Sequence, residues 1–526
     1  MRSNGIDEMI LGDVIERNAL LYGDRLAVEC HGLRFTHAEF AARARRLANA
    51  LIRGGLARQD RVAVLAQNCS EYLDVYAAGE MAGFITATVN YRLAPPEMAW
   101  LLNDCTPSVL FFGAEYAETV KALRPSIPSV RRFICIGGKT DWSESHDAVL
   151  NGGADAPLPF RAREEDTAYL IYTSGTTGRP KGVRIGQKEQ VLSAWNMALE
   201  GSVEPTEKIL ITTPLYHAGG KWVQLSHHWR GCPVYILKSF EPAKVLETIH
   251  RERITATLLP ATMLQAVLEQ PNFRDFDLSC LRTVYYSAAP MPVALLRQAI
   301  AAMGNIFIQF YGLTEAGGTG TSLYKHHHVL DGDPAWVARL ASAGQAKTCC
   351  EVRVVRDDGT DCDVGEPGEI LIKNPTLMQG YWNNAEATRE ALRDGWLYTG
   401  DIGQFDAGRF LYVVDRKKDM IVSGGVNIYC REVEDAVHHH PAVHEAAVIG
   451  VPDDQWGESV HAFVVLRKGR SATAEELQEH CRTLIASFKK PKSFDFVASL
   501  PKLPSGKVNK VELREPYWKN RSRRVN

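Results

Sequence analysis

Apolar runs of strand length alternate with amphipathic runs of helix length between about residue 40 and residue 340. The run RVAVLAQN is typical of a strand, and SEYLDVYAAGEMAG, which follows it, is typical of a helix. The alternation recurs from KVLETIHRERI to IFIQFYG, where helix-like and strand-like runs take turns. Such a βαβα order predicts an α/β fold whose parallel sheets are covered by helices.

The pattern changes after residue 345. Short strand-like runs such as GEILIKN and GRFLYVV are separated by turn-forming stretches such as RDDGTD, which predicts a β-rich subdomain. Farther on, helix-like and strand-like runs predict a small α+β unit. We therefore expect a large N-terminal domain, 1–415, of parallel-sheet α/β subdomains plus the β-rich subdomain, and a small α+β C-terminal domain, 416–526. The charged stretch VVDRKKDMI is the expected joint.

Composition narrows the class of protein. The chain has 526 residues, 45% of them hydrophobic and 23% charged, with a net charge of -2, which gives no field that would attract nucleic acid. No apolar run is long enough to span a bilayer, and acidic residues interrupt the N-terminal segment where a signal peptide would be apolar. The 11 cysteines include no Cys-x-x-Cys pair, which favours a reduced, cytoplasmic compartment.

The stretch YTSGTTGRPKG, residues 172–182, concentrates hydroxyls, glycines and a cation in one loop. It is not a P-loop, because Lys181 follows Pro180 and precedes Gly182 instead of a serine or threonine. A solvated surface loop is the alternative, but the composition favours a loop that binds a polyphosphate. The residues expected to bind it are Thr173, Ser174, Gly175, Thr176, Thr177, Gly178 and Lys181.

This loop closely resembles the signature loop of the adenylate-forming superfamily, which includes acyl- and aryl-CoA ligases, beetle luciferases and peptide-synthetase adenylation domains. YGLTE, YTGD, DRKKDMIVSGGVNIYCREVE and PKLPSGKV follow it in the family's order, so the resemblance covers essentially the whole chain. It implies that a carboxylate attacks the α-phosphorus of MgATP to give acyl-AMP and pyrophosphate, and that the thiol of CoA then displaces AMP. ATP, Mg²⁺ and CoA, the last as a substrate, are therefore expected.

The resemblance also implies roles in adenylation. Lys507 would bridge the carboxylate and the α-phosphate, and Glu315 would be the magnesium-associated carboxylate, with Thr314 near the α-phosphate. Asp401 and Arg416 would contact the ribose. The adenine site would include Ala288, Ala289, Pro290, Tyr311 and Gly312, and the family often has glycine at the position of Ala288.

For the second half-reaction, the resemblance implies a mobile C-terminal domain that rotates about Lys418. Gly424 and Gly425 would then face the active site and let pantetheine pass close to the backbone. Trp456 and Lys490 lie in stretches that resemble the patch where some relatives hold the CoA nucleotide.

The acid itself is less well specified. The resemblance implies an acyl pocket lined by His217, Lys221, Trp222, Ala288 and Gly317. Lys221 could pair with a second polar group on the acid or point to solvent, and solvent is the favoured reading. Trp222 could form the floor for an aromatic or cyclic acid or block a long tail, so fatty and aryl acids both stay open.

Three other functions remain. An adenylating enzyme that loads a separate carrier protein would share every motif, and so would a luciferase-like oxygenase; a nucleotide-binding regulator without turnover would not need Lys507 and Glu315. The histidine triplets 326–328 and 438–440 lack a metal-binding framework and are interpreted as structural or incidental. The stretch GGTGTS lacks the third glycine of a dinucleotide fingerprint. The sequence does not define the oligomeric state, and the resemblance allows a homodimer.

Overall fold

The computed structural model describes residues 9–173, 180–289, 291–424, 426–502 and 508–519. The chain forms two compact units. Unit 1 consists of Met1–Val352 and Ile372–Tyr398, and unit 2 consists of Arg353–Leu371 and Thr399–Asn526. The domain boundary expected at residue 415 stays a prediction.

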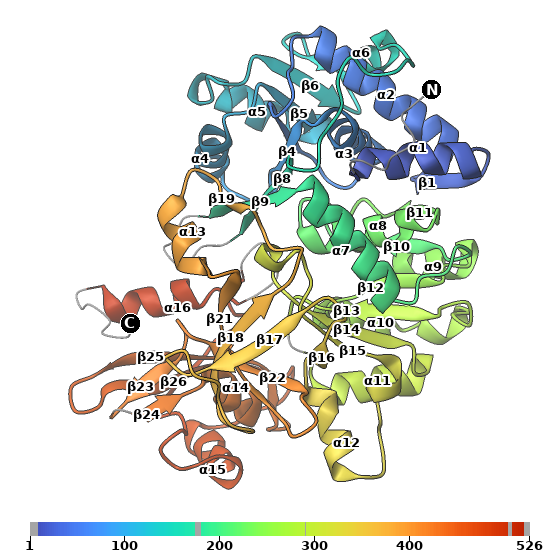
Figure 1. Cartoon of the computed structure of the whole chain (residues 1–526). Coiled ribbons are helices and arrows are strands. Elements are labelled where there is room, and N and C mark those ends of the chain that lie inside the picture. The colour runs from blue at the N-terminus through green and yellow to red at the C-terminus, as the bar shows by residue number, and fades with distance from the viewer. Residues whose placement is uncertain (1–8, 174–179, 290, 425, 503–507, 520–526) are drawn as a thin grey trace. The chain divides into compact units, whose positions relative to one another are not determined.

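An eight-stranded sheet forms the first layer of unit 1, in the order β19-β9-β8-β4-β3-β5-β6-β7 (Figure 1). The strands from β8 to β7 pair in parallel, whereas β9 pairs antiparallel with both β8 and β19. Its strands are β3 (Arg61–Leu65), β4 (Ile85–Thr88), β5 (Val109–Gly113), β6 (Arg132–Ile136), β7 (Glu144–Ser145), β8 (Thr167–Thr173), β9 (Lys181–Gly186) and β19 (Gly380–Tyr381). The helices of this region are α2 (His37–Arg53), α3 (Ser70–Ala82), α4 (Pro95–Cys105), α5 (Ala117–Leu123) and α6 (His146–Gly152).

A nine-stranded sheet forms the second layer, in the order β16-β15-β14-β13-β12-β10-β11-β1-β2 (Figure 1). The central strands pair in parallel, and β15, β16 and β2 extend the edges antiparallel. Its strands are β1 (Leu26–Cys30), β2 (Leu33–Thr36), β10 (Ile209–Ile211), β11 (Val234–Ile236), β12 (Ala256–Leu258), β13 (Thr283–Tyr286), β14 (Phe307–Tyr311), β15 (Thr321–Leu323) and β16 (Gln345–Ala346). The helices of this region are α9 (Pro242–Glu252), α10 (Ala261–Leu268), α11 (Val293–Met303) and α12 (Pro334–Ala338), whereas α1 (Leu11–Tyr22) packs against α2 and α3.

Two helices pack against each other between these sheets, α7 (Gln187–Glu200) and α8 (Ala218–Trp229) (Figure 1). Both carry buried polar side chains, which is unusual for helices in a core. Lys221 on α8 bonds to α3 of the first layer, whereas Ser193 on α7 bonds to the turn after β14 of the second. These helices therefore join the two layers with polar contacts.

The remaining strands form two smaller sheets. One has the order β17-β18-β21-β20 with β22 on β21, and the other has the order β24-β23-β26-β25 with β27 on β26. Their strands are β17 (Glu351–Val355), β18 (Gly368–Lys373), β20 (Leu392–Arg393), β21 (Trp396–Phe405), β22 (Leu411–Arg416), β23 (Ile421–Ser423), β24 (Val426–Ile428), β25 (Val443–Asp453), β26 (Gly457–Leu466) and β27 (Ser493–Phe496). The helices here are α13 (Ala385–Ala391), α14 (Cys430–His438), α15 (Ala474–Leu484) and α16 (Lys510–Trp518).

The predicted fold class is confirmed. Parallel α/β layers precede a β-rich segment, and a small α+β region ends the chain. Among the described helices, none is both long enough and apolar enough to cross a bilayer.

Candidate active site

Glu315 lies in a short 3-10 turn directly after β14, and two hydroxyl groups contact its carboxylate. Thr173 Oγ1, at the end of β8, donates a hydrogen bond to Glu315 Oε1 at 3.3 Å, and the hydroxyl of Tyr381 donates to the same oxygen at 3.1 Å. The backbone N–H of Met378 donates to the Glu315 carbonyl at 2.8 Å. The structure thus joins the ends of β8, β14 and β19 at one carboxylate, as expected for loops that follow strands of adjacent α/β layers.

The turn that carries Thr314 and Glu315 is tight because two glycines meet in it. A Cβ on Gly312 would come within 2.7 Å of the carbonyl carbon of Gly318, so only glycine fits at residue 312 without movement. Gly317 and Gly318 both have positive φ, at +63° and +71°. The Ser193 hydroxyl stabilises the turn by donating a hydrogen bond to the carbonyl of Gly317 at 2.7 Å.

Sequence reasoning missed Tyr381. This residue of β19 bonds to Glu315, and the ammonium of Lys181 lies 4.9 Å from the centre of its ring. Lys181 begins β9, which pairs with both β8 and β19. The stretch GYWNN is not one of the motifs that carry the family resemblance, and the contact depends on strand pairing across a long separation in sequence. Tyr381 therefore connects the expected phosphate-binding lysine with the expected magnesium-associated carboxylate.

Ala288 occupies a backbone conformation that favours glycine. It follows β13 and has a φ of +70°, which lies in the left-handed region. This geometry gives a physical reason for the glycine that the family often has at this position. Ala289, next to it, is half-buried, and Tyr311 is half-buried at the end of β14.

His217 lies at the start of α8, after a loop that accepts hydrogen bonds from α3 and from the segment between β3 and α3. Asn68 donates to the carbonyl of Thr213 at 3.0 Å, and Tyr76 donates to the carbonyl of Leu215 at 2.9 Å. The imidazole packs beside the ring of Tyr216, with centroids 4.4 Å apart. The backbone around His217 is therefore fixed, whereas its role at the acyl pocket stays a prediction.

Lys221 requires a correction. Its side chain is only 2% exposed, so the expectation that it points to solvent is wrong. Its ammonium lies 2.6 Å from Glu80 Oε1 and donates to Gln224 Oε1 at 2.8 Å. The hydroxyl of Tyr169 also donates to Glu80 Oε1, at 2.5 Å. Burial lowers the pKa of Lys221, and the attraction to Glu80 opposes that shift. This cation is already paired, so it is poorly placed to hold an anionic substrate group.

Trp222 packs on the turn after β14. A Cβ on Gly318 would come within 2.4 Å of the indole, so the ring lies directly against this glycine. The indole N–H donates to Gln190 Oε1 on α7 at 3.2 Å. Trp222 thereby adjoins Gly317 and Gly318, part of the segment expected to line the acyl pocket, and its role there stays a prediction.

In unit 2, Asp401 and Arg416 form a pair across β21 and β22. The two residues are opposite one another in register, and Arg416 Nε lies 2.5 Å from Asp401 Oδ1. Asp401 is 4% exposed, whereas the Arg416 side chain is 42% exposed. The Asp401 carboxylate has two acceptor oxygens, so it is chemically suited to accept hydrogen bonds from two ribose hydroxyls.

The predicted joint lies between β22 and β23. Burial raises the pKa of Asp415 to about 6 and lowers the pKa of Lys418. Next to Lys418, Arg514 of α16 forms an ion pair with Asp419. Charged groups at this joint are therefore partly removed from water.

Two of the expected CoA-binding residues contact each other. A Cβ on Gly424, whose φ is +58°, would come within 2.6 Å of the Trp456 indole, and Gly424 N–H donates to the Trp456 carbonyl at 2.8 Å. The indole is 46% exposed. The ammonium of Lys492 lies 5.4 Å from the ring centre of Trp456, whereas Lys490 is half-buried. The structure places Lys492, rather than the predicted Lys490, beside this tryptophan.

Several predicted residues lie outside the described part of the chain. They are Ser174, Gly175, Thr176, Thr177, Gly178, Pro290, Gly425 and Lys507.

The donor set around Glu315 is compatible with magnesium. Mg²⁺ is commonly held by one or two carboxylates together with substrate phosphates and water, so a single carboxylate fits that role when a nucleotide is bound. Among the described residues, no group of three or more His, Cys, Asp or Glu side chains could hold a metal ion. His328 of the first histidine triplet instead contacts the hydroxyl of Tyr286 at 2.9 Å, in agreement with the structural interpretation.

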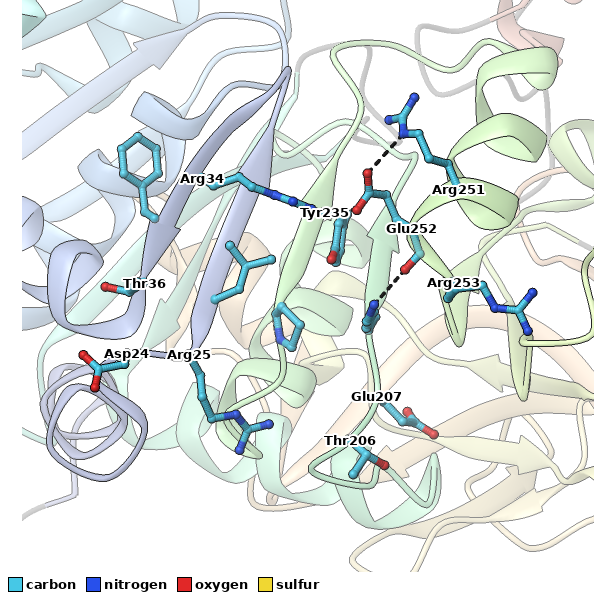
Figure 2. A pocket seen from close by; sticks show the side chains of 14 residues that line it. Asp24, Arg25, Arg34, Thr36, Thr206, Glu207, Tyr235, Arg251, Glu252 and Arg253 are labelled. Atoms are coloured by element: carbon cyan, nitrogen blue, oxygen red, sulfur yellow. Dashed lines mark hydrogen bonds and ion pairs between the residues drawn. The ribbon is translucent and has the colours of Figure 1, made fainter.

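A groove of about 680 Å³ lies elsewhere in unit 1, at the amino ends of β10 and β11 (Figure 2). Figure 2 shows Glu252 between Arg34 and Arg251, and ion pairs of 2.6 Å and 3.1 Å join them. None of the predicted site residues lines this groove. In parallel sheets ligands bind at the carboxyl ends of the strands, where Glu315 and His217 lie, so the groove is not the candidate active site.

The fold and this site define an AMP-binding enzyme. A family model described as AMP-binding enzyme matches residues 15–382, and another, described as AMP-binding enzyme C-terminal domain, matches residues 432–507. The chain therefore belongs to the AMP-binding enzyme family, and the predicted resemblance to the adenylate-forming superfamily is confirmed.

Within this family, the chain is similar along nearly its whole length to several CoA ligases. The chain is 37% identical to a feruloyl-CoA synthase of an Amycolatopsis species, over 98% of this chain and 100% of the relative. It is 35% identical to a long-chain-fatty-acid–CoA ligase of Mycobacterium tuberculosis, over 92% and 93%. The solved o-succinylbenzoate CoA synthetase of Bacillus subtilis superposes with a TM-score of 0.85 at 30% identity, covering 97% of this chain and 98% of that chain.

Proposed function

We propose that this protein is an AMP-forming carboxylic acid–CoA ligase. The acid and ATP give acyl-AMP and pyrophosphate, and the thiol of CoA then displaces AMP to give acyl-CoA. The observation that carries the proposal is the meeting of Thr173, Glu315 and Tyr381 at the ends of three strands, in a chain whose full-length relatives include CoA ligases.

The first half-reaction brings two anions together. A carboxylate and a phosphate at contact distance repel each other by about 4 kcal/mol at an effective dielectric constant of 20, so cations must offset that cost. We assign a phosphate contact to Lys181, which is half-buried beside Tyr381, and the bridging cation to Lys507. Glu315 would hold Mg²⁺, which when bound neutralises phosphate charge. No general base is needed, because the attacking carboxylate is already ionised at neutral pH.

The second half-reaction needs access for a thiol. We assign the hinge to Lys418, and the pantetheine path to the backbone at Gly424, where a positive φ and a missing side chain allow close approach. The indole of Trp456 and the ammonium of Lys492 offer a stacking surface and a phosphate contact for the nucleotide of CoA.

Fatty and aryl acids both remain candidate substrates. Trp222 packed on Gly318 is a flat apolar wall that suits an aromatic ring or limits a long tail. The relatives include a feruloyl-CoA synthase and a long-chain-fatty-acid–CoA ligase, so they span the same two classes.

Loading of a separate carrier protein is the second candidate function. A fatty acid–[acyl-carrier-protein] ligase of Streptomyces coeruleorubidus is 32% identical over 95% of both chains. We also propose a cytoplasmic location, which the free state of all 11 cysteines supports, whereas the homodimer stays a prediction.

The test is mass spectrometry of the products formed from MgATP, CoA and a panel of fatty, aryl and cyclic acids. We expect AMP and one acyl-CoA to accumulate with the wild-type protein, and much less with Glu315→Gln. Formation of acyl-AMP that CoA does not consume would favour the carrier-loading function. Absence of any adenylate with every acid would contradict the ligase function.

A further inference from the structure

Lys347 is a buried cation with almost no polar partner. The residue is 1% exposed, and the only hydrogen bond of its ammonium among the described residues is to the carbonyl of Gly318, at 3.4 Å. The ammonium also lies 3.9 Å from the ring centre of Phe310. A buried charge is costly unless it is paired and well hydrogen-bonded, so this lysine needs an explanation.

Lys221 shows how this protein satisfies another buried lysine. That ammonium contacts the Glu80 carboxylate and the Gln224 amide, and it lies over the ring of Tyr76. In the described part of the chain, no carboxylate forms an ion pair with Lys347. The carboxylate of Glu200 attracts it from a distance. The buried charge of Lys347 therefore has fewer polar partners than the buried charge of Lys221.

Strand register places Lys347 on the face of the sheet that carries Phe310. Phe310 is opposite Ser322 in β15, and Ser322 is opposite Gln345 in β16. Opposed residues of antiparallel strands share a face, and so do residues two apart in one strand. Lys347 follows Gln345 by two, and its N–H continues the ladder by donating to the Gly320 carbonyl at 3.0 Å.

Helix α7 supplies further buried polar groups near the same turn. Glu200 accepts from the N–H of Thr348 at 2.9 Å and from the hydroxyl of Tyr324, so both of its carboxylate oxygens are used. Gln190 binds the Trp222 indole through Oε1, but its amide Nε2, in a residue that is 1% exposed, has no partner among the described residues. The same is true of Oδ1 of Asn196, which is 8% exposed. Two buried polar atoms of α7 therefore lack a hydrogen-bond partner among the described residues.

We propose that Lys347 is a specificity-determining residue whose ammonium pairs with an oxygen acceptor at the far end of the acid substrate, such as a phenol or a second carboxylate. This inference rests on the proposed function, because the far end of the acid would have to lie beside Gly317 and Gly318. The ammonium bonds to the carbonyl of Gly318, and Trp222 packs on the same residue, so an acid lying along the indole would present its far end to Lys347. Gln190 Nε2 is a second donor for that oxygen.

The test compares acids that differ only at the far end: cinnamate, 4-hydroxycinnamate and 4-carboxycinnamate, and decanoate with decanedioate. The proteins are the wild type, Lys347→Met, and Lys373→Met as a control, since Lys373 is exposed. We expect the wild type to prefer a distal oxygen in one acid series by roughly 10- to 100-fold in kcat/KM, the effect of one charged hydrogen bond. Lys347→Met should lose that preference while retaining its rate with the acid that lacks the oxygen. The hydroxy and carboxy arms identify which acceptor is used.

Three outcomes would overturn the inference. If the wild type shows no preference within either series but does form acyl-CoA, Lys347 has no role in specificity and the ligase function stands. If Lys347→Met loses activity equally with all acids and its melting temperature falls, the lysine is structural; the inference predicts a melting temperature that is unchanged or higher. If no acid gives AMP or acyl-CoA, the proposed function itself fails.

Discussion

At the scale of single residues, unit 1 buries two lysines in different ways: the Lys221 ammonium forms an ion pair with a carboxylate, whereas the Lys347 ammonium bonds to a backbone carbonyl. Glu80 and Lys221 lie on different helices, α3 and α8, and meet in the core at 2.6 Å with Tyr169 as a third partner. A buried ion pair of this kind stabilises the fold little more than well-packed apolar residues would. Removal of one partner, however, leaves an uncompensated buried charge.

Lys221→Met should therefore destabilise the protein by about 3–5 kcal/mol, because it leaves the Glu80 carboxylate buried without its cationic partner. The double variant Lys221→Met with Glu80→Gln should recover most of that loss. Urea denaturation followed by tryptophan fluorescence measures both. Lys244→Met is the matched control, since Lys244 pairs with Glu241 at the surface and should change stability by less than about 1 kcal/mol. Equal losses in the single and double variants would contradict the pairing argument.

Lys347 predicts a pH dependence of stability. Burial lowers its pKa from the ordinary 10.5 to about 8. Between these values the unfolded chain binds the proton and the folded chain does not, so stability rises with pH in this window. The wild type should gain about 2 kcal/mol relative to Lys347→Met between pH 7 and pH 9.5, because each unit contributes 1.36 kcal/mol. Parallel stability curves for the two proteins would show that the ammonium is not disfavoured by folding.

At the scale of elements, the stretches before and after residues 174–180 form strands β8 and β9, which pair antiparallel rather than parallel, with Thr173 opposite Lys181. This register places the first and last residues of the expected phosphate-binding loop side by side. Alternating apolar runs predicted the parallel strands well, whereas the antiparallel extension at β9 and β19 has no distinct pattern of its own.

The predicted joint between β22 and β23 is the element on which the proposed second half-reaction would depend. Proline at residue 418 would fix φ and restrict Lys417, so rotation there should be hindered. We expect Lys418→Pro to form acyl-AMP at a rate close to that of the wild type but to transfer the acyl group to CoA at least about tenfold more slowly. Stopped-flow measurement of the two half-reactions tests this, with Lys418→Ala as the control. Normal acyl transfer in the proline variant would remove residue 418 as the hinge.

At the scale of the whole molecule, sequence motifs were sufficient for the fold class and the family but not for the polar contacts of the core. YGLTE and YTGD are contiguous, so they can be recognised without a structure. Lys221 and Glu80, or Glu315 and Tyr381, are far apart in the chain and meet only through sheet and helix packing. Local pattern carries no information on such pairs, which is why Lys221 was expected in solvent and Tyr381 was not identified.

In the ligase reaction, the carboxylate of the acid attacks the α-phosphorus of ATP. The most direct test of this attack uses an accepted acid labelled with ¹⁸O in both carboxylate oxygens, incubated with MgATP and CoA. Acyl-AMP keeps one oxygen of the acid as the bridge to phosphorus, and this oxygen leaves with AMP when the thiol of CoA attacks the carbonyl carbon. We therefore expect one ¹⁸O atom in the AMP and one in the thioester. Label in a released phosphate, or formation of ADP in place of AMP, would contradict it.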